Sequence, residues 1–282
     1  MKYLKRFELL VIYGIVIPLL FLISDSELVW QPEQYLHGNY FQTEVNELFR
    51  KSFNPQPFGS ILDVGSGDGH YTNILANNLK KGQVLGIDSS PEMVQYANEH
   101  WARNNLLFEV HKIEEYQPGV VFDFILSFWC LHWTKIELSF PNIFNALKDE
   151  GRFYAVLSSF SDNSVWQAWQ HLLHNNRYSE LAQQNINQFS LYINYFYRVL
   201  NVLNKIPFKR IKLELQTVTI CLPNMEYFKG LLLTLPFMTK VPAQIQDDLS
   251  NTLCDAFQKI CQRKYNGKLY YETRPIFLEA IK

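Results

Sequence analysis

The sequence predicts an α/β fold with a mostly parallel seven-stranded sheet, an antiparallel last strand and a helical cap. Three observations support this prediction. An apolar run at 60–64 leads into a glycine-rich loop and then a helical pattern, which is the strand–turn–helix geometry that holds nucleotide-like ligands. Strand-like and helix-like runs then alternate as far as residue 158, which favours parallel strands with right-handed crossovers. From 164 to 203 the pattern becomes helical and aromatic-rich, as expected for a cap.

Apolar periodicity and turn residues place the individual elements. The first helix is expected within 27–52, where Phe41, Val45, Leu48 and Phe49 recur at helical spacing. We expect the next strands at 60–64, 83–87, 106–111, 122–128 and 152–158, and helices at 70–80, 91–103 and near 141–148. The last two strands are expected within 210–221 and 269–281, with the final one inserted antiparallel.

Composition limits the function classes. The chain has 282 residues, of which 48% are hydrophobic and 15% aromatic, enough for a large core and an aromatic-lined pocket. The net charge is −1, so no overall field favours nucleic acid. The four cysteines form no C-x-x-C pair, and we therefore expect reduced thiols and no metal site. The sequence does not indicate an oligomeric state.

The glycine-rich loop selects the class of ligand. Residues 63–69 read D-V-G-S-G-D-G, whereas a dinucleotide fingerprint needs its third glycine at position 70, where this chain has His70. The spacing D-x-G-x-G-x-G resembles motif I of S-adenosylmethionine (SAM)-dependent methyltransferases. Glycines remove the Cβ atoms that would keep the backbone away from a compact, cationic amino acid. We expect the loop to bind SAM through Asp63, Gly65, Ser66, Gly67 and Gly69.

Further cofactor contacts are expected after the second and third strands. Asp88 ends the run at 83–87, where folds of this kind accept hydrogen bonds from both ribose hydroxyls. Ser89 follows it, and Met93 lies where an adenine ring would pack. The backbone amide of Ile113 is the donor expected for adenine. These residues complete the predicted cofactor site on the sheet.

The fourth strand and the loop after it indicate the class of methyl acceptor. Residues 121–133 read V-F-D-F-I-L-S-F-W-C-L-H-W. Substrates bind outside the carboxyl ends of such strands, and we expect Ser127 to contact the cofactor there. The segment F-S-F-W-C-L-H-W closely resembles the corresponding one in juvenile hormone acid methyltransferases. Trans-aconitate methyltransferases have a comparable L-x-W ending and resemble this chain at 30–35 as well.

The resemblance covers roughly residues 30–282 and implies a Rossmann-like class I methyltransferase fold. In that family a glutamine of the first helix and the tryptophan of the L-H-W segment hold the substrate carboxylate, which by position are Gln42 and Trp133. A carboxylate is ionised at neutral pH, so it needs orienting donors but no general base. His132 is the alternative catalytic residue, as a base for a hydroxyl or nitrogen acceptor.

One position departs from the family pattern. Many relatives carry an acid after the third strand that meets the adenine amine, whereas this chain has Lys112 there. Glu114 could substitute for that acid. The departure concerns the affinity for SAM and leaves the identity of the cofactor unchanged.

The leading hypothesis is a SAM-dependent methyltransferase that acts on a small or lipophilic carboxylic acid. One alternative is base-assisted O- or N-methylation of another small molecule. A second is a non-catalytic SAM-binding protein in which Lys112 marks a decayed site, and a dinucleotide oxidoreductase is more distant. We expect one domain at 27–282, with a cofactor half at about 55–160 and cap helices at about 161–208 and 223–265.

The N-terminal residues indicate a hydrophobic leader. Three basic residues precede an apolar run at 9–23, which is shorter than the ~20 residues of a spanning helix. Such a leader resembles a signal peptide or a short anchor, yet export would separate the enzyme from SAM. We therefore expect a cytoplasmic domain with a membrane-associated or dispensable leader at 1–26.

Overall fold

The computed structural model describes residues 39–50, 59–79, 81–117, 119–161, 163–190, 194–239 and 241–282. The leader at 1–26 and the segment at 30–35 lie outside these residues, so the expectations placed on them stay predictions. Among the helices described, none has both the length and the hydropathy that a bilayer crossing requires.

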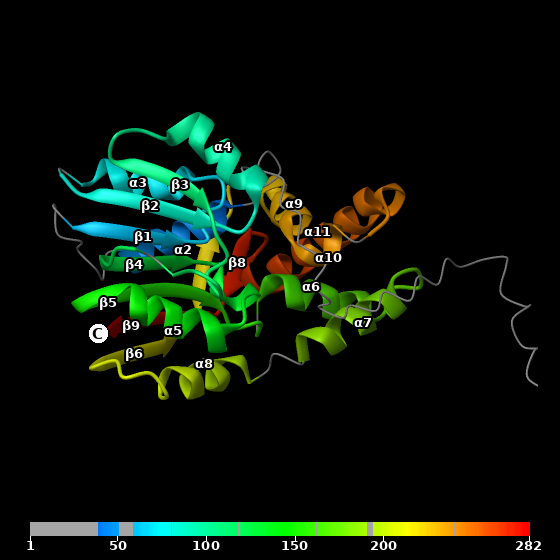
Figure 1. Cartoon of the computed structure of the whole chain (residues 1–282). Helices are drawn as coiled ribbons and strands as arrows, with labels where there is room; N and C mark the ends of the chain where they lie inside the picture. Colours follow the sequence, from blue (N-terminus) through cyan, green and yellow to red (C-terminus); the bar gives the residue numbers. More distant parts are fainter. Residues whose placement is uncertain are drawn as a thin grey trace, which may run out of the picture.

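Seven strands form the central sheet in the order β3-β2-β1-β4-β5-β9-β6 (Figure 1). The neighbours from β3 to β5 pair in parallel, and β9 pairs antiparallel with both β5 and β6. This confirms the predicted parallel sheet with an inserted antiparallel last strand. The strands are β1 (Ser60–Val64), β2 (Gln83–Asp88), β3 (Leu106–Val110), β4 (Phe122–Phe128), β5 (Leu147–Ser158), β6 (Arg210–Leu215), β7 (Val218–Cys221), β8 (Tyr270–Thr273) and β9 (Pro275–Ile281).

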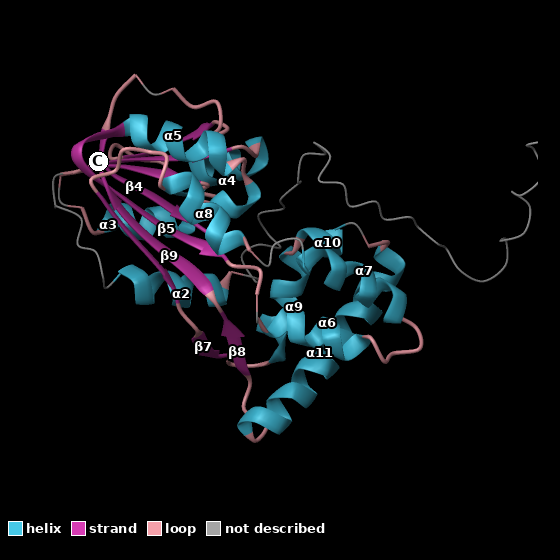
Figure 2. Ribbon diagram, turned by 90° about the horizontal axis from the view of Figure 1, so that it is seen from below, coloured by secondary structure: helices cyan, strands magenta, loops and turns pink. Residues whose placement is uncertain are grey.

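The helices fall into a set that flanks the sheet and a set that forms a separate lobe beside it (Figure 2). The flanking set is α2 (Tyr40–Arg50), α3 (His70–Asn77), α4 (Pro91–Trp101), α5 (Ile136–Ala146) and α8 (Tyr195–Leu203), with a short 3₁₀ turn, η1 (Leu131–Trp133). The lobe, which we call the cap, contains α6 (Ser164–Leu172), α7 (Ser179–Ser190), α9 (Met225–Thr234), α10 (Pro236–Thr239) and α11 (Ala243–Tyr265).

Strand alternation divides the core between the two faces of the sheet. Ile61 joins the apolar cluster that contains Val45 of α2 and Leu75 of α3. Its neighbour Leu62 joins the cluster on the other face, with Phe140 of α5. Successive side chains of a strand point to opposite faces, so a strand covered on both faces is apolar throughout.

Helix α5 begins at Ile136, five residues before the expected start near 141, and contains Pro141. Ile136, Phe140 and Ile143 are all fully buried and recur at helical spacing. The free energy gained by burying these three side chains outweighs the loss of the one backbone hydrogen bond that proline removes from the helix interior.

The two predicted C-terminal strands are each divided in two. Leu215 of β6 faces Ile276 of β9, and Val218 of β7 faces Thr273 of β8, so one ladder continues in the same register. Pro275 interrupts this ladder, because it accepts a bond from the Gln216 N–H (3.2 Å) but has no N–H to return. Beyond the break, β7 and β8 form a separate two-stranded sheet between the main sheet and the cap.

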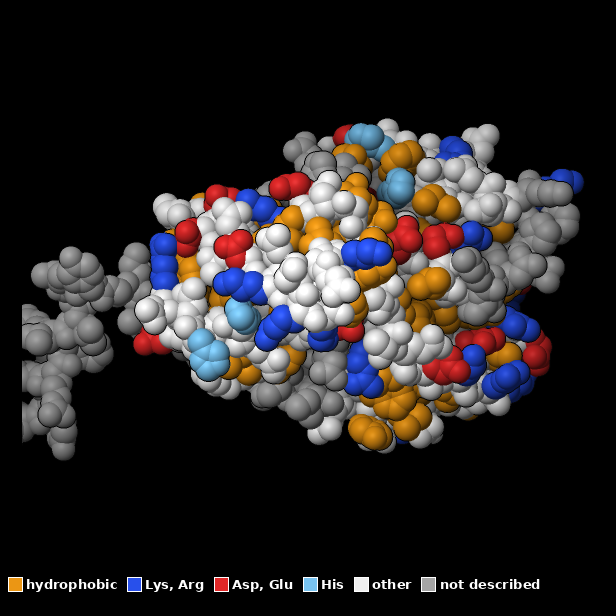
Figure 3. Space-filling view, turned by 180° about the vertical axis from the view of Figure 1, so that it is seen from behind, with side chains coloured by type: hydrophobic (Ala, Val, Ile, Leu, Met, Phe, Trp, Pro, Cys, Tyr) orange, Lys and Arg blue, Asp and Glu red, His pale blue; other side chains and the backbone are white. Residues whose placement is uncertain are grey.

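Charges of both signs are interspersed on the surface. Figure 3 shows lysine and arginine side chains beside aspartate and glutamate on the face opposite to that of Figure 1. This mixture agrees with the net charge of −1.

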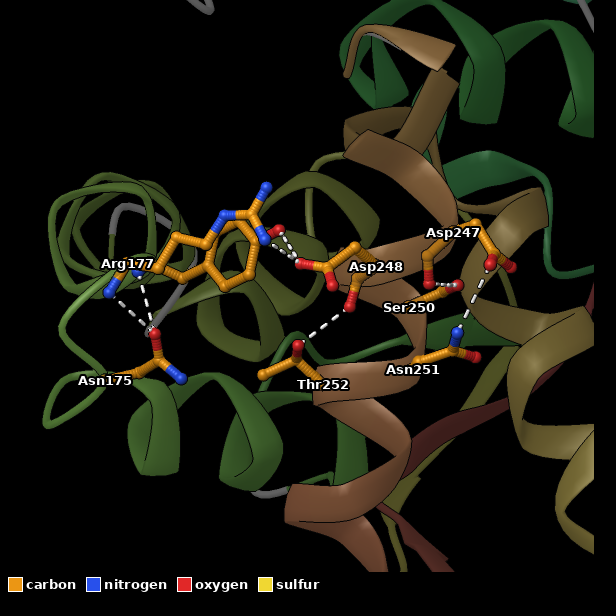
Figure 4. A network of polar contacts seen from close by, with 8 residues as sticks. Asn175, Arg177, Asp247, Asp248, Ser250, Asn251 and Thr252 are labelled. Atoms are coloured by element: carbon orange, nitrogen blue, oxygen red, sulfur yellow. Dashed lines mark hydrogen bonds and ion pairs between the residues drawn. The ribbon is translucent and has the colours of Figure 1, made fainter. Parts of the chain in front are cut away.

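A polar network joins the turn before α7 to α11 in the cap (Figure 4). The carboxylate of Asp248 accepts from the hydroxyl of Tyr178 and from the guanidinium of Arg177 (2.7 Å). Tyr178 is buried, whereas the neighbouring Asp247 forms an exposed ion pair with Lys229 (2.7 Å). Of the two adjacent aspartates, Asp248 therefore contacts a buried residue and Asp247 forms a surface ion pair.

We expect Asp248→Ala to lower the free energy of unfolding by about 0.5–1.5 kcal/mol, because the Tyr178 hydroxyl and the Arg177 guanidinium lose their shared charged acceptor. The matched Asp247→Ala should cost at most about 1 kcal/mol, as exposed ion pairs do. Chemical denaturation measures both variants. Equal losses would show that the Tyr178 bond does not hold the start of α7 to α11.

Candidate functional site

The glycine loop after β1 folds as its sequence requires. Gly65, Gly67 and Gly69 have φ of 77°, 54° and 76°, in the left-handed region that favours glycine. A Cβ on Gly65 would lie 2.2 Å from the Cβ of Cys130 in the loop after β4. The backbone amides of Gly65 and Ser66 donate to the carbonyl of Ile87 at 2.8 and 3.0 Å. The loop is thus held closely between the ends of β2 and β4.

Asp88 connects the end of β2 to this loop. Its Oδ2 accepts from the backbone N–H of Gly67 (3.0 Å), and its Oδ1 accepts from that of Ser90 (2.9 Å). Burial raises the pKa of the Asp88 carboxyl. Asp88, the residue predicted to bind the ribose, therefore contacts the glycine loop. The adjacent Ser89 is exposed.

Asp63 lies at the end of β1, and its side chain is 3% exposed. The hydroxyl of Thr72 in α3 donates to its Oδ2 at 2.6 Å. Burial raises the pKa of Asp63 from its usual 3.8 to about 6, although the Thr72 bond opposes this shift.

A pocket lies beside the glycine loop, with walls from α2, the loop itself, the first turn of α3 and the end of β4. It brings the predicted Gln42 together with the predicted loop residues, although they lie far apart in the sequence. The lining residues are Asn39, Gln42, Thr43, Asn46, Asp63, Gly65, Ser66, Gly67, Asp68, His70, Tyr71, Phe128 and Trp129.

Trp129, at the end of β4, fixes α2 against the pocket. Its indole N–H donates to Oδ1 of Asn46 at 3.0 Å, and its ring meets Phe41 edge-on at 5.3 Å. Trp129 has φ of 59°, which is unusual for a bulky residue. The Asn46 bond and a backbone bond to Val156 (2.8 Å) hold it there. Asn46 is one helical turn after Gln42, so both amides lie on one side of α2.

His132 and Trp133 occupy η1, outside this lining. His132 is 8% exposed, its Nδ1 accepts from the Ser158 N–H (3.3 Å), and burial lowers its pKa to about 3. Trp133 is 39% exposed, with its ring 4.8 Å from that of His132 and 5.8 Å from that of Phe160. Neither residue is among those that line the pocket, so their roles stay predictions.

Three predicted cofactor residues are buried in the described structure. Ser127 is fully buried, and its hydroxyl donates to the carbonyl of Val64 (2.8 Å). Met93 and Ile113 are 2% and 4% exposed, and the Ile113 carbonyl accepts from the Asn142 amide (2.9 Å). Their contact with the cofactor stays a prediction.

The sequence reasoning missed eight lining residues: Asn39, Thr43, Asn46, Asp68, His70, Tyr71, Phe128 and Trp129. Asp68, His70 and Tyr71 stand inside the glycine motif or directly after it, so their position was an available signal. Asn46 could have been found from Gln42, because residues four apart share a helix face.

The electrostatics of the pocket favour a cationic ligand. Burial raises the pKa of both Asp63 and Asp68, and no lysine or arginine stands among the described lining residues. A buried carboxylate without a cationic partner costs free energy, which a bound cation would recover.

The profile of a family described as a methyltransferase domain matches residues 57–252. Juvenile hormone acid O-methyltransferase of Drosophila melanogaster is 27% identical over 248 residues, covering 80% of this chain and 82% of that protein. Trans-aconitate 2-methyltransferase of Escherichia coli is 30% identical over 125 residues, covering 43% of this chain and 48% of that protein.

Among solved structures, phosphoethanolamine N-methyltransferase 2 of Haemonchus contortus, in complex with S-adenosyl-L-methionine, superposes with a TM-score of 0.55 at 21% identity. The match covers 85% of this chain and 52% of that one, so the chain spans about half the length of that structure. This likeness concerns the fold.

We expect Asp63→Asn to change how stability depends on pH. Asp63 has its pKa raised on folding, so its contribution is fully present below about pH 4 and is lost as the pH rises through about 6. Asparagine keeps an oxygen for the Thr72 hydroxyl and does not ionise. As the pH rises from 4 to 7, the free energy of unfolding of the variant should therefore increase relative to that of the wild type by up to about 3 kcal/mol.

Denaturation of the ligand-free protein across this pH range measures the difference between the two proteins. A stability difference that stays constant with pH would contradict the buried, titrating carboxyl.

Proposed function

The chain belongs to the methyltransferase domain family and is a SAM-dependent methyltransferase, and we propose that its acceptor is the carboxylate of a small or lipophilic acid. The observation that carries this proposal is the place of Gln42. Its neutral amide lines the same pocket as Gly65 and Gly67 of the cofactor loop.

The described pocket suits SAM. The cofactor carries an ammonium and a sulfonium, and the lining supplies buried carboxylates with raised pKa values. Ser66 Oγ and Asp68 Oδ2 are buried polar atoms without a hydrogen-bond partner among the described residues. When bound, SAM supplies an electrophilic methyl group. The glycine loop and Asp88 would hold it beside Gln42.

A carboxylate acceptor fits the neutral donors of α2. The acceptor is already ionised, so Gln42 needs only to orient one oxygen by donating an N–H to it. Asn46 lies one turn further along the same side of α2, and its oxygen is already occupied by Trp129. Its amide N–H group is therefore the part of the side chain that an acceptor could use. The names of the relatives, which refer to acid substrates, agree with this acceptor class.

Aromatic side chains favour an apolar acceptor. Tyr71 and Phe128 line the pocket with their rings 5.2 Å apart, and Trp129 lies beside them. Such a wall excludes water and leaves the acceptor carboxylate less solvated. We propose Trp133 as a second donor at the carboxylate, on the strength of the family resemblance and its partly exposed ring.

The alternative is base-assisted methylation of a hydroxyl or amine. Burial and the low pKa of His132 argue against it as the base. The imidazole in the described lining is that of His70, so the alternative would use His70.

We place the enzyme in the cytoplasm, where SAM is available, with residues 9–23 as a membrane-associated leader. Cell fractionation with N-terminal sequencing tests this placement. Recovery of a processed chain outside the cytoplasm would refute it.

Using the best acceptor from a panel of alkanoic, terpenoid and polycarboxylic acids, we expect Gln42→Ala to lower kcat/KM by about 10- to 100-fold, because one hydrogen bond to a charged acceptor is lost. SAM affinity should stay nearly unchanged. Glu44→Ala, an exposed position of the same helix, is the matched control and should have little effect.

We expect His70→Gln to leave the rate with a carboxylic acid within a few-fold of the wild type, because a carboxylate has no proton to remove. The pH–rate profile measures the same property and should stay flat above the acceptor pKa. A loss of more than about 100-fold in His70→Gln, together with a silent Gln42→Ala, would favour the base-assisted reaction.

A further inference from the structure

Strand β6 forms one edge of the central sheet, where the strand order ends (Figure 1). It pairs with β9 on one side, and no described strand pairs with it on the other. An edge strand with unpaired backbone groups is a template on which another strand can add. Which strand it accepts depends on where these backbone groups lie and on the side chains beside them.

The hydrogen bonds on the two sides of β9 show which residues of β6 direct their backbone groups outward. The Gln216 N–H donates to the carbonyl of Pro275 (3.2 Å), on the β6 side of β9. The Lys282 N–H donates to the carbonyl of Gly151 (3.0 Å), on the β5 side. Because bonded pairs alternate along an antiparallel ladder, the even-numbered residues of β6 bond to β9. The outward backbone groups are therefore those of Ile211, Leu213 and Leu215.

The side chains of β6 alternate between a charged face and an apolar face. Lys212 and Glu214 lie on the face that borders a groove beside α2, with their side chains 51% and 40% exposed. Their charged groups are 3.1 Å apart. On the other face, the three outward residues are partly buried against the apolar cluster that contains Val199 of α8. The edge therefore offers unlike charges on one face and apolar surface on the other.

We propose that β6 pairs antiparallel with β6 of a second copy of this chain, about a two-fold axis at Leu213. In this register Leu213 faces Leu213 of the second copy, and Ile211 faces Leu215. These are the residues with outward backbone groups, so each facing pair exchanges both N–H···O=C bonds. On the charged face, Lys212 of each copy lies opposite Glu214 of the other. Unlike charges directly opposite each other stabilise a pair of strands.

Other two-fold registers fit this sequence less well. An axis at residue 212 or 214 would place like charges opposite each other, and the facing residues there already bond to β9. An axis at residue 211 would place Arg210 opposite Lys212. Charged residues on an edge strand ordinarily keep other strands away, whereas here their order favours one self-pairing register. Strands β5 and β9 separate β6 from β4, so the inference does not depend on the acceptor.

Sedimentation equilibrium of the full chain tests this pairing. A contact made by one edge strand is a small interface, below about 1,200 Å², which dissociates readily. The wild type should therefore pass from monomer to dimer as its concentration rises through the micromolar range. Each variant below should keep the circular dichroism spectrum and the melting temperature of the wild type, because the altered side chains lie at the surface.

Lys212→Glu alone and Glu214→Lys alone should each weaken the dimer by about tenfold or more, because like charges then face each other on both sides of the axis. Mixed in equal amounts, the two variants should associate with each other, since the acidic strand of one faces the basic strand of the other. The matched control is Lys259→Glu, which makes the same change of charge at an exposed position of the cap and should leave association unchanged.

Three results would overturn the inference. The first is a wild type that stays monomeric at every soluble concentration. The second is a dimer that neither single variant weakens, which would place the contact on another surface of the chain. The third is a mixture of the two variants that associates no better than each variant alone, which would exclude the antiparallel register at Leu213.

Discussion

The close contact between the glycine loop and the ends of β2 and β4 is the constraint on which the site depends. Gly65 has no room for a side chain because Cys130 occupies that space, and the loop amides donate to Ile87 and Asp88. This contact fixes the distance between three strand ends, which is where parallel sheets bind ligands. With the loop fixed, the first turn of α3 and the end of β4 form the pocket walls.

The fourth wall, α2, comes from a segment that precedes the sheet. The bond from Trp129 to Asn46 joins it to β4, and this bond places Gln42 beside the cofactor loop. The pocket therefore combines acids from the loop with neutral amides from α2. This division of charge suits a cationic methyl donor on one side and an anionic acceptor on the other.

Much of the fold could be predicted because it depends on local patterns. The strand at 122–128 and the glycine loop follow from apolar runs and from the φ values that only glycine adopts readily. The break in the strand pairing at Pro275 could not be predicted from β propensity, because it depends on which residue of the partner strand faces the proline. For the site, Gln42 came from resemblance and lies in the pocket, which Trp129 also lines, while the role of Trp133 stays a prediction. Trp129 could not be found from local patterns, because its place depends on a backbone φ of 59° and on the bond to Asn46.

The central claim is that the methyl group goes to a carboxylate. Incubating the protein with SAM that carries a tritium-labelled methyl group and a panel of carboxylic acids tests it directly. A methyl ester should form, so mild alkali should release the label from the product as volatile methanol. Label that is transferred but stays in the product after alkaline treatment would indicate an ether or N-methyl product and would contradict the account.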